Sequence, residues 1–361
     1  MKMRGFIVMS LVLVVLLAAG VSLISASPLA QEQPEGFAVI SAPGNQVHPQ
    51  LAYNPNAQQH MVVWSDEQDI FAQRLSRQGQ ANPPIIPIST ARGRQDWPAV
   101  AFDPAQDRYL VIWDDDRNAA FTGHDLWGRF FDPNGAPMGA EFIVITAPGN
   151  QRQPRLVFNS TQQSYLLVWR DSRNAAATGL DIWGQLLFNS GLRRGGSFSI
   201  STAPADQSDP AVAFNPSSND YVVYWSDNRD PESKNLYGQR LAPGPGAANK
   251  RGREIDRLVD NDSNQFAPSL SFDEGQNEYL VVWCDDRGGP ETFLDLMIRR
   301  LGGNGFPSAE TDSFVSTTGD QASSGLAYDS DARVNLAVWG DNRNLFTGGW
   351  DIFGEFWPAS P

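Results

Sequence analysis

The sequence predicts an all-β protein, a six-bladed β-propeller built from four-stranded antiparallel blades. Three observations support this fold class. A segment centred on a tryptophan recurs six times, each copy holds four short apolar runs, and the run missing from the last copy is found near the N-terminus. The repeated tryptophans, at spacings of 49, 56, 56, 58 and 56 residues, are Trp64, Trp113, Trp169, Trp225, Trp283 and Trp339.

Each copy is expected to form four strands, which we call a, b, c and d. In the second copy they are Pro98 to Phe102, Tyr109 to Trp113, Leu126 to Phe131 and Phe142 to Thr146. Runs this short, bounded by Gly, Pro, Asn and Asp, favour strands over helices. Runs a and b are apolar on both faces, as in sheets covered on both sides. Four-stranded sheets repeated radially are typical of a propeller.

The two ends of the chain predict how the ring closes. The last copy stops after its c run, Asp351 to Phe356, whereas Gly36 to Gln46 matches Glu141 to Gln151, a d strand with its exit loop. We therefore expect Phe37 to Ser41 to complete the last blade beside Ile352 to Phe356. This pairing removes the free sheet edges that a linear stack would expose and gives six blades.

The repeat resembles that of secreted bacterial β-propellers of the TolB-type and WD40-like superfamily. The likeness rests on the run Tyr-Leu-Val-Val-Trp-x-Asp-x-Arg-Asn followed by Asp-Ile-x-Gly-Gln-Arg, and it covers residues 36–357. It implies the propeller fold. Because these propellers are mostly binding and scaffold modules, it implies little about a particular function. TolB has a separate N-terminal domain without a counterpart in this sequence, so its partner contacts are not carried over.

The first residues are typical of an export signal. Lys2 and Arg4 precede an apolar run from Phe6 to Ile24, and small residues follow, with cleavage expected after Ala26 or Ala30. We expect residues 1–26 to be a signal peptide, 27–35 a linker and 36–361 one propeller domain. The apolar run is also long enough for an uncleaved membrane anchor. The expected location is extracytoplasmic: secreted, periplasmic or at the cell surface.

Charge and cysteine content exclude several function classes. Without the leader the chain has 25 basic and 41 acidic residues, a net charge of −16. Such a surface repels phosphate backbones and anionic lipids, so we expect no nucleic-acid partner, and membrane contact only through the leader. The single cysteine, Cys284, has no partner for an internal disulfide and no repeated His beside it, so a nucleophilic role is not indicated.

No cofactor is expected, with Ca²⁺ as the one alternative. Asp114 to Asp116 and Asp260 to Asp262 offer hard oxygen ligands, but neither has the spacing of a calcium-binding loop.

The repeated polar residues are predicted to share one face, that of the b–c and d–a loops. A glutamine two residues before strand a recurs in every copy, and exposed aromatic residues in the b–c loops could add contacts for a glycan or peptide. The ligand-binding candidates are therefore Gln46, Gln95, Gln151, Gln207, Gln265, Gln321, Phe121 and Trp350.

A second repeated set is interpreted as structural. An Asp at the end of strand b, an Arg two residues later and an Asp at the start of strand c could fix each b–c hairpin, with the Arg bridging both carboxylates. The members of this hairpin network are Asp115, Arg117, Asp125, Asp171, Arg173, Asp181, Asp227, Arg229, Asp285, Arg287, Asp295, Asp341, Arg343 and Asp351.

These features favour an exported, non-catalytic binding or scaffold module with a glycan or protein partner in the envelope or extracellular space. A structural subunit of a surface assembly is one alternative. A propeller-type glycoside hydrolase is another, but it needs two carboxylates in distinct environments. The acids of this sequence recur at equivalent points, and its three histidines, His48, His60 and His124, do not.

Overall fold

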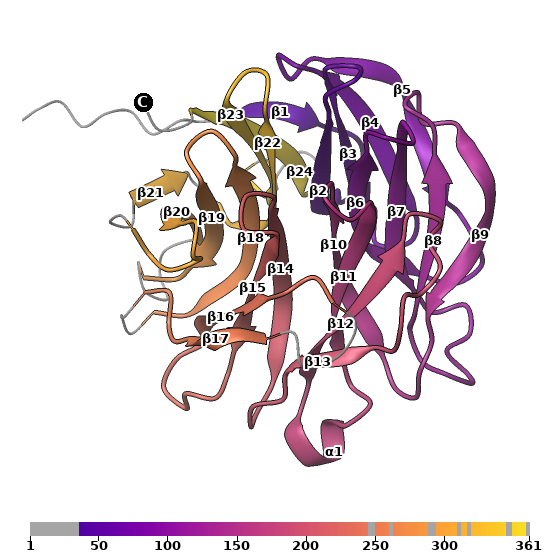
Figure 1. The fold of residues 1–361 in the computed structure, drawn as a ribbon. Coiled ribbons are helices and arrows are strands. Elements are labelled where there is room, and N and C mark those ends of the chain that lie inside the picture. The colour runs from indigo at the N-terminus through magenta and orange to yellow at the C-terminus, as the bar shows by residue number, and fades with distance from the viewer. Residues whose placement is uncertain are drawn as a thin grey trace, which may run out of the picture. The chain divides into compact units, whose positions relative to one another are not determined.

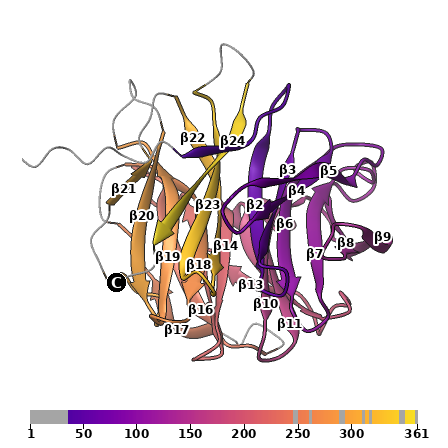
Figure 2. The same ribbon diagram turned by 90° about the horizontal axis from the view of Figure 1, so that it is seen from above.

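The computed structural model confirms a six-bladed propeller of four-stranded antiparallel sheets (Figures 1 and 2). The structure describes residues 36–244, 250–259, 263–287, 294–308, 312–315, 319–343 and 349–358. The predicted leader and linker, residues 1–35, lie outside the described residues. The only helix in the described part is the single turn α1 (Ala175–Thr178). No described helix has the length and apolar character needed to cross a membrane.

Five blades are built from four consecutive strands each. The first contains β2 (Val47–Asn54), β3 (Gln59–Ser65), β4 (Ile70–Ser76) and β5 (Ala81–Ser89). The second contains β6 (Gln95–Asp103), β7 (Arg108–Asp115), β8 (Asp125–Phe131) and β9 (Pro137–Ile145). The third contains β10 (Gln151–Asn159), β11 (Ser164–Asp171), β12 (Asp181–Phe188) and β13 (Phe198–Ser201). The fourth contains β14 (Gln207–Asn215), β15 (Asp220–Asp227), β16 (Asn235–Leu241) and β17 (Lys250–Ile255). The fifth contains β18 (Gln265–Asp273), β19 (Glu278–Asp285), β20 (Asp295–Gly302) and β21 (Asp312–Val315).

The sixth blade combines both ends of the propeller, as predicted. It contains β22 (Gln321–Asp329), β23 (Val334–Asp341), β24 (Asp351–Pro358) and the N-terminal strand β1 (Phe37–Ile40). In the antiparallel ladder Phe37 faces Gly354 and Ala38 faces Phe353. Figures 1 and 2 show β1, drawn in indigo, beside the yellow strands of the C-terminal segment. The ring is therefore closed by the segment that follows the predicted leader.

The hydrophobic core is divided into six clusters, each formed between two neighbouring blades. Trp113 of the second blade, for example, packs with Met61 and Val63 of the first and is fully buried. Both faces of strands a and b are covered in this way, which explains why their sequences lack an apolar–polar alternation.

The a–b turns carry a repeated cap that the sequence analysis did not single out. The last residue of every strand a is a buried Asn or Asp whose side-chain oxygen accepts hydrogen bonds from turn amides. These six residues are Asn54, Asp103, Asn159, Asn215, Asp273 and Asp329.

The b–c and d–a loops lie on the same face, where they bind one another. Asn150, in the loop before β10, accepts a hydrogen bond from the His124 amide at 3.0 Å, and its own amide donates to the Ser172 hydroxyl at 2.7 Å. It thereby joins the b–c loops of the second and third blades. We call an Asn in this position of a d–a loop a latch. The backbone amide of Trp350 donates to the latch residue Asn45, so a latch also connects the two ends of the propeller.

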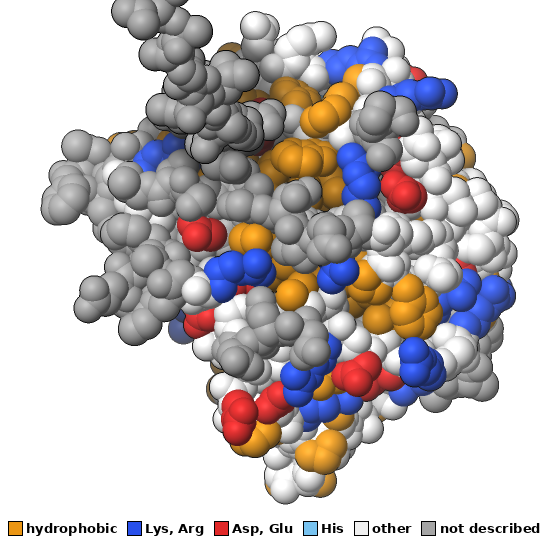
Figure 3. Space-filling model, turned by 90° about the vertical axis from the view of Figure 1, so that its left-hand side faces the viewer, with side chains coloured by type: hydrophobic (Ala, Val, Ile, Leu, Met, Phe, Trp, Pro, Cys, Tyr) orange, Lys and Arg blue, Asp and Glu red, His pale blue; other side chains and the backbone are white. Residues whose placement is uncertain are grey.

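Basic and acidic side chains are mixed on the side of the molecule shown in Figure 3, with hydrophobic side chains between them. Among the described residues of that side, neither sign of charge forms a continuous patch.

Candidate functional site

The six repeated glutamines are buried at the start of the strand-a segments, and all of them except Gln95 donate hydrogen bonds to carbonyl groups of their own loops. Neither polar side-chain atom of Gln95 has a hydrogen-bond partner among the described residues. Gln46 Nε2 donates to the carbonyls of Ala42 and Gly44 at 3.1 and 2.9 Å. Gln207 repeats this arrangement with Ala203 and Ala205. These side chains shape the d–a loops from within. The ligand-binding role that the sequence suggested for Gln46, Gln95, Gln151, Gln207, Gln265 and Gln321 stays a prediction.

The repeated tryptophan, aspartate and arginine form one compact unit in five blades. In the second blade Trp113 Nε1 donates to Asp115 Oδ2 at 3.1 Å, and the Arg117 guanidinium binds both carboxylate oxygens at 2.8 and 2.6 Å. The same Trp–Asp hydrogen bond is made by Trp169, Trp225, Trp283 and Trp339. The corresponding Arg–Asp ion pairs, all at 2.6 Å, are Arg173–Asp171, Arg229–Asp227, Arg287–Asp285 and Arg343–Asp341.

The second partner of the arginine differs from the predicted one. Arg117 stacks on the Trp127 ring at 4.0 Å and pairs with Glu141, whereas Asp125 at the start of strand c accepts a hydrogen bond from the Thr122 hydroxyl at 2.9 Å. The third blade likewise stacks Arg173 on the ring of Trp183. The expected Arg bridge to Asp125 and Asp181 was therefore wrong, because the N–H groups of Arg117 and Arg173 bind Asp115, Glu141 and Asp171, and an aromatic ring on strand c holds each guanidinium by its face.

The remaining members of the predicted network also lie at the b–c hairpins. Asp181 is within 3.5 Å of Asn174 Nδ2, and Asp351 faces Asp341 across the β23–β24 ladder. Asp295 faces Asp285 in the same way across β19 and β20.

The two predicted aromatic contacts have different surroundings. Phe121 is 91% exposed at the tip of the b–c loop of the second blade. Trp350 is half-buried, and its carbonyl accepts a hydrogen bond from the Gln46 amide at 2.8 Å. Their part in ligand binding stays a prediction.

The three aspartates of the acidic run Asp114 to Asp116, considered for Ca²⁺, each have different partners. Asp114 faces His124 and Arg152, Asp115 holds Arg117, and Asp116 accepts a hydrogen bond from the Arg94 amide at 2.6 Å. The other run, Asp260 to Asp262, lies outside the described residues. Within the described ranges no group of three or more side chains of metal-ligating type comes together.

A feature of strand a that sequence reasoning missed creates an asymmetric site. Each strand a begins with Gln-x-x-Pro (Gln-x-x-Ser in the sixth blade), and the residue before this Pro or Ser has a left-handed backbone with φ between 50° and 54°. The strand ladder shifts register there, as in a bulge. These six residues are His48, Trp97, Gln153, Asp209, Ala267 and Ser323. A left-handed non-glycine residue is uncommon, and because it recurs in all six blades the conformation belongs to the bulge, whereas the side chains differ from blade to blade.

Three residues of each blade form a group that we call the polar mouth. They are the two variable residues of the Gln-x-x-Pro or Gln-x-x-Ser segment and the residue that follows the repeated Trp. Asp96 stands at its centre and is fully buried. It accepts a hydrogen bond from Arg94 at 2.8 Å and interacts with His48 Nδ1 at 2.8 Å, while Arg152 of the third blade lies 3.7 Å away. Burial alone would raise the pKa of Asp96, but His48, Arg94 and the Trp97 amide outweigh it and hold that pKa below its usual range.

Two further carboxylates extend this cluster across the blades. Asp114, also fully buried, lies 3.3 Å from Arg152 Nε and 3.2 Å from His124 Nδ1. Asp209 of the fourth blade accepts hydrogen bonds from Gln153 Nε2 at 2.6 Å and from the Ser208 hydroxyl at 2.9 Å. The charged part of the mouth therefore spans the first four blades.

An aromatic pair lies beside these charges. The imidazole of His48 stacks on the indole of Trp97 with ring centroids 3.4 Å apart and planes inclined by 17°, and both side chains are partly exposed. The fifth and sixth blades contribute Ala267, Ser323 and other uncharged residues at the equivalent positions. The mouth thus has one charged side, which includes the His48–Trp97 pair, and one uncharged side, which includes the partly exposed Phe266.

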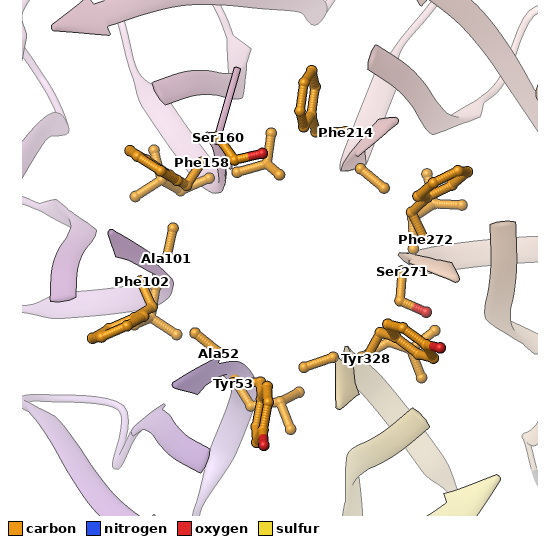
Figure 4. A pocket seen from close by; sticks show the side chains of 18 of the residues that line it. Ala52, Tyr53, Ala101, Phe102, Phe158, Ser160, Phe214, Ser271, Phe272 and Tyr328 are labelled. Atoms are coloured by element: carbon orange, nitrogen blue, oxygen red, sulfur yellow. The ribbon is translucent and has the colours of Figure 1, made fainter. Parts of the chain in front are cut away.

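The opposite end of the central channel is nearly symmetric. An open cavity of about 300 Å³ lies there, and aromatic residues from all six strands a surround it, as Figure 4 shows. They are Tyr53, Phe102, Phe158, Phe214, Phe272 and Tyr328. Their repetition marks them as packing between blades, whereas the departures from six-fold symmetry gather at the polar mouth.

Comparison with known proteins supports the fold and leaves the family open. No protein-family model matches the chain, and no curated protein matches it in sequence. Among solved structures it is similar to a protein of unknown function from Dyadobacter fermentans, with a TM-score of 0.70 and 10% identity over 91% of this chain and 99% of that one. It is also similar to an α-L-arabinanase of Penicillium chrysogenum complexed with arabinobiose, with a TM-score of 0.64 and 13% identity over the same shares of both chains. An α-L-arabinofuranosidase of Fusarium graminearum has a TM-score of 0.60 and 10% identity over 89% and 98%. At these identities the likeness concerns the propeller fold alone.

Proposed function

We propose that this protein is an exported, glycan-binding propeller whose site is the polar mouth on the face of the b–c and d–a loops. The observation that carries the proposal is the break in six-fold symmetry at the left-handed residues. A side chain that only stabilised its blade would be expected in every blade. His48, Trp97, Arg152 and Asp209 each occur once, and they converge from four blades.

The chemistry of the mouth suits a hydroxyl-rich ligand. Carboxylates such as Asp96 and Asp114 accept hydrogen bonds from hydroxyl groups, and Arg94 and Arg152 can donate them. The partly exposed Trp97 and Phe266 offer apolar ring faces to a ligand. Two structural neighbours are enzymes of arabinan and arabinose chemistry, which supports an oligosaccharide as the ligand class.

The test is binding of arabino-oligosaccharides and a panel of other plant and microbial oligosaccharides, measured by calorimetry. Trp97→Asn removes the ring but keeps a residue type that tolerates a left-handed backbone. We expect at least a roughly tenfold loss of affinity, the equivalent of about 1.4 kcal/mol. Phe121→Ala removes an exposed ring from the same face and serves as the matched control. Loss of binding in Phe121→Ala with full binding in Trp97→Asn would move the site to the b–c loops.

A glycoside hydrolase is the second candidate, favoured by the buried carboxylates Asp96 and Asp114 and by the hydrolase neighbours. The lowered pKa of Asp96 suits a base or nucleophile, and hydrolysis also needs a protonated carboxyl group. Incubation with the same oligosaccharides and with aryl glycosides separates the two functions. Turnover that disappears in Asp114→Asn while binding persists would establish an enzyme, and binding without turnover would establish a binding module.

A further inference from the structure

Arg155 on β10 breaks the six-fold pattern inside the channel, below the polar mouth. The residue four positions after the repeated glutamine is neutral in every other blade, where it is Gln50, Ala99, Ala211, Ser269 or Gly325. Only 5% of Arg155 is exposed. A guanidinium has therefore been placed on the inner strand of a blade where its counterparts carry no charge.

The guanidinium of Arg155 is charged and lacks a counter-ion. Its NH1 group donates to the carbonyl of Pro154 at 3.0 Å, and its Nε has no hydrogen-bond partner. No carboxylate of the described residues forms an ion pair with it. Arg117, by contrast, donates hydrogen bonds to both carboxylate oxygens of Asp115. Burial lowers the pKa of Arg155 to about 10, and the charge of Asp209 only partly opposes this. A buried, unpaired charge is costly, so a missing partner is expected.

A small cavity adjoins this side chain. Its volume is about 50 Å³, and its polar lining comes from Arg155, Gln50 and Ser269. The amide of Gln50 is already bound to the carbonyls of Pro49 and Ser324 at 2.7 and 2.9 Å. Most of the remaining lining is a ring of aliphatic residues, one from each strand a, namely Leu51, Val100, Leu156, Val212, Leu270 and Leu326. The space exceeds that needed for one water molecule and is too small for a sugar.

We propose that Arg155 binds a small monovalent anion, of the size of chloride or formate, in this cavity. The guanidinium supplies the charge and directed N–H donors, and the anion removes the penalty of an unpaired buried charge. The aliphatic ring excludes larger and more strongly hydrated anions such as sulfate. Because the ring includes β2 and β22, which adjoin at the closure of the propeller, the anion site exists only in the closed molecule.

The test is the thermal unfolding of the propeller at pH 7 and constant ionic strength, with gluconate replaced stepwise by chloride, by formate or by sulfate. Once the site is filling, we expect Tm to rise by about 2 °C for each tenfold increase in chloride or formate. Sulfate should give no such rise. In Arg155→Met the dependence on chloride and formate should disappear. Arg129→Met, which removes a surface arginine, should keep it.

A second expected result distinguishes an anion site from an arginine that merely packs. In gluconate alone, Arg155→Met should unfold at the same temperature as the wild-type protein or higher, because it removes an uncompensated charge. If Arg155→Met fails to fold, bromide-soaked crystals of the wild-type protein decide the matter by an anomalous peak at the guanidinium. A wild-type Tm indifferent to chloride and formate, or an equal rise in Arg155→Met, would overturn the proposal. Neither outcome depends on whether the polar mouth binds a glycan.

Discussion

His60 shows how one residue can depart from the repeat and become sensitive to pH. It occupies the strand-b position held by tyrosine in four other blades, and it is fully buried against Tyr53, with ring centroids 5.0 Å apart. Neither ring nitrogen has a hydrogen-bond partner. Burial lowers the pKa of His60 from 6.5 to about 4, although the nearby Asp329 opposes the shift. The imidazole is therefore neutral in the folded protein at pH 7.

This lowered pKa predicts acid sensitivity between pH 6.5 and pH 4. Below pH 6.5 the unfolded chain binds a proton at His60, whereas the folded protein binds it only near pH 4. The free energy of unfolding is therefore unaffected by His60 above pH 6.5 and falls as the pH is lowered from there. The loss should approach about 3 kcal/mol at pH 4. Urea unfolding at a series of pH values measures it. His60→Phe keeps a ring of similar size without a titrating group, and its stability should fall less over this interval. Parallel curves for both proteins would contradict the prediction.

Arg173 tests the stabilising role of the Trp–Asp–Arg unit. Its removal leaves the buried Asp171 carboxylate with the Trp169 indole and the backbone amide of residue 173 as donors. We expect Arg173→Ala to lower the free energy of unfolding by roughly 1–3 kcal/mol. Arg92→Ala, at an exposed position in the loop before β6, should change it by less than about 0.5 kcal/mol. Equal effects of the two substitutions in urea unfolding would show that the unit does not brace the hairpin.

The sequence predicted only part of this unit, for a physical reason. The two-residue spacing of Asp171 and Arg173 is enough to place them in one turn, so their pairing could be predicted. The stacking of Arg173 on Trp183 depends on register, because Trp183 faces Trp169 across the β11–β12 ladder. Cross-strand neighbours of this kind are not set by local spacing.

At the scale of the element, the latch residue of the d–a loop is predicted to couple adjacent blades. Asn150 accepts from the His124 amide of one blade and donates to Ser172 of the next. Asn150→Ala removes the side-chain acceptor, and we expect a loss of about 1 kcal/mol in unfolding free energy. Protease cleavage in the 117–124 loop should become faster. Asn134→Ala, in an exposed turn of the second blade, is the control and should alter neither measurement.

The segment containing Gln-x-x-Pro shows why the candidate site was hard to predict. The repeated Gln drew attention because it recurs, yet its side chain is buried in its own loop. The two residues that follow it vary between copies and therefore carry no signal in a repeat. Asp96 and Arg152 lie 56 residues apart in the sequence and meet only because consecutive strands a are neighbours around the axis. The fold is visible in what the blades share, and the site in what they do not.

For the whole molecule, the sequence predicted the number of blades because the missing strand and the surplus strand have matching sequences. In a closed ring the first and last blades are neighbours, so the surplus N-terminal strand can complete the last copy of the repeat. Six copies then give six blades. The structure bears this out in the register of β1 with β24. The interior of the channel could not be predicted in this way. All six strands a line it, and its character depends on which residues of different blades come to lie next to one another. Arg155 and the aliphatic ring around it are an example.

The closing strand should differ from an outer strand elsewhere in the ring because its loss opens the propeller. Val39 in β1 is buried with Leu51 and Val62 of the first blade, and its counterpart in the outer strand β9, Val144, is equally buried between the second and third blades. We expect Val39→Asp and Val144→Asp each to cost about 3–5 kcal/mol, because an unpaired charge would lie between two blades, but only Val39→Asp should open the ring.

Urea unfolding with small-angle scattering measures both consequences. An opened ring has a larger radius of gyration and exposes β2, β22 and β24 to protease. If the Val39→Asp and Val144→Asp proteins were equally compact, closure by the N-terminal strand would not hold the propeller together.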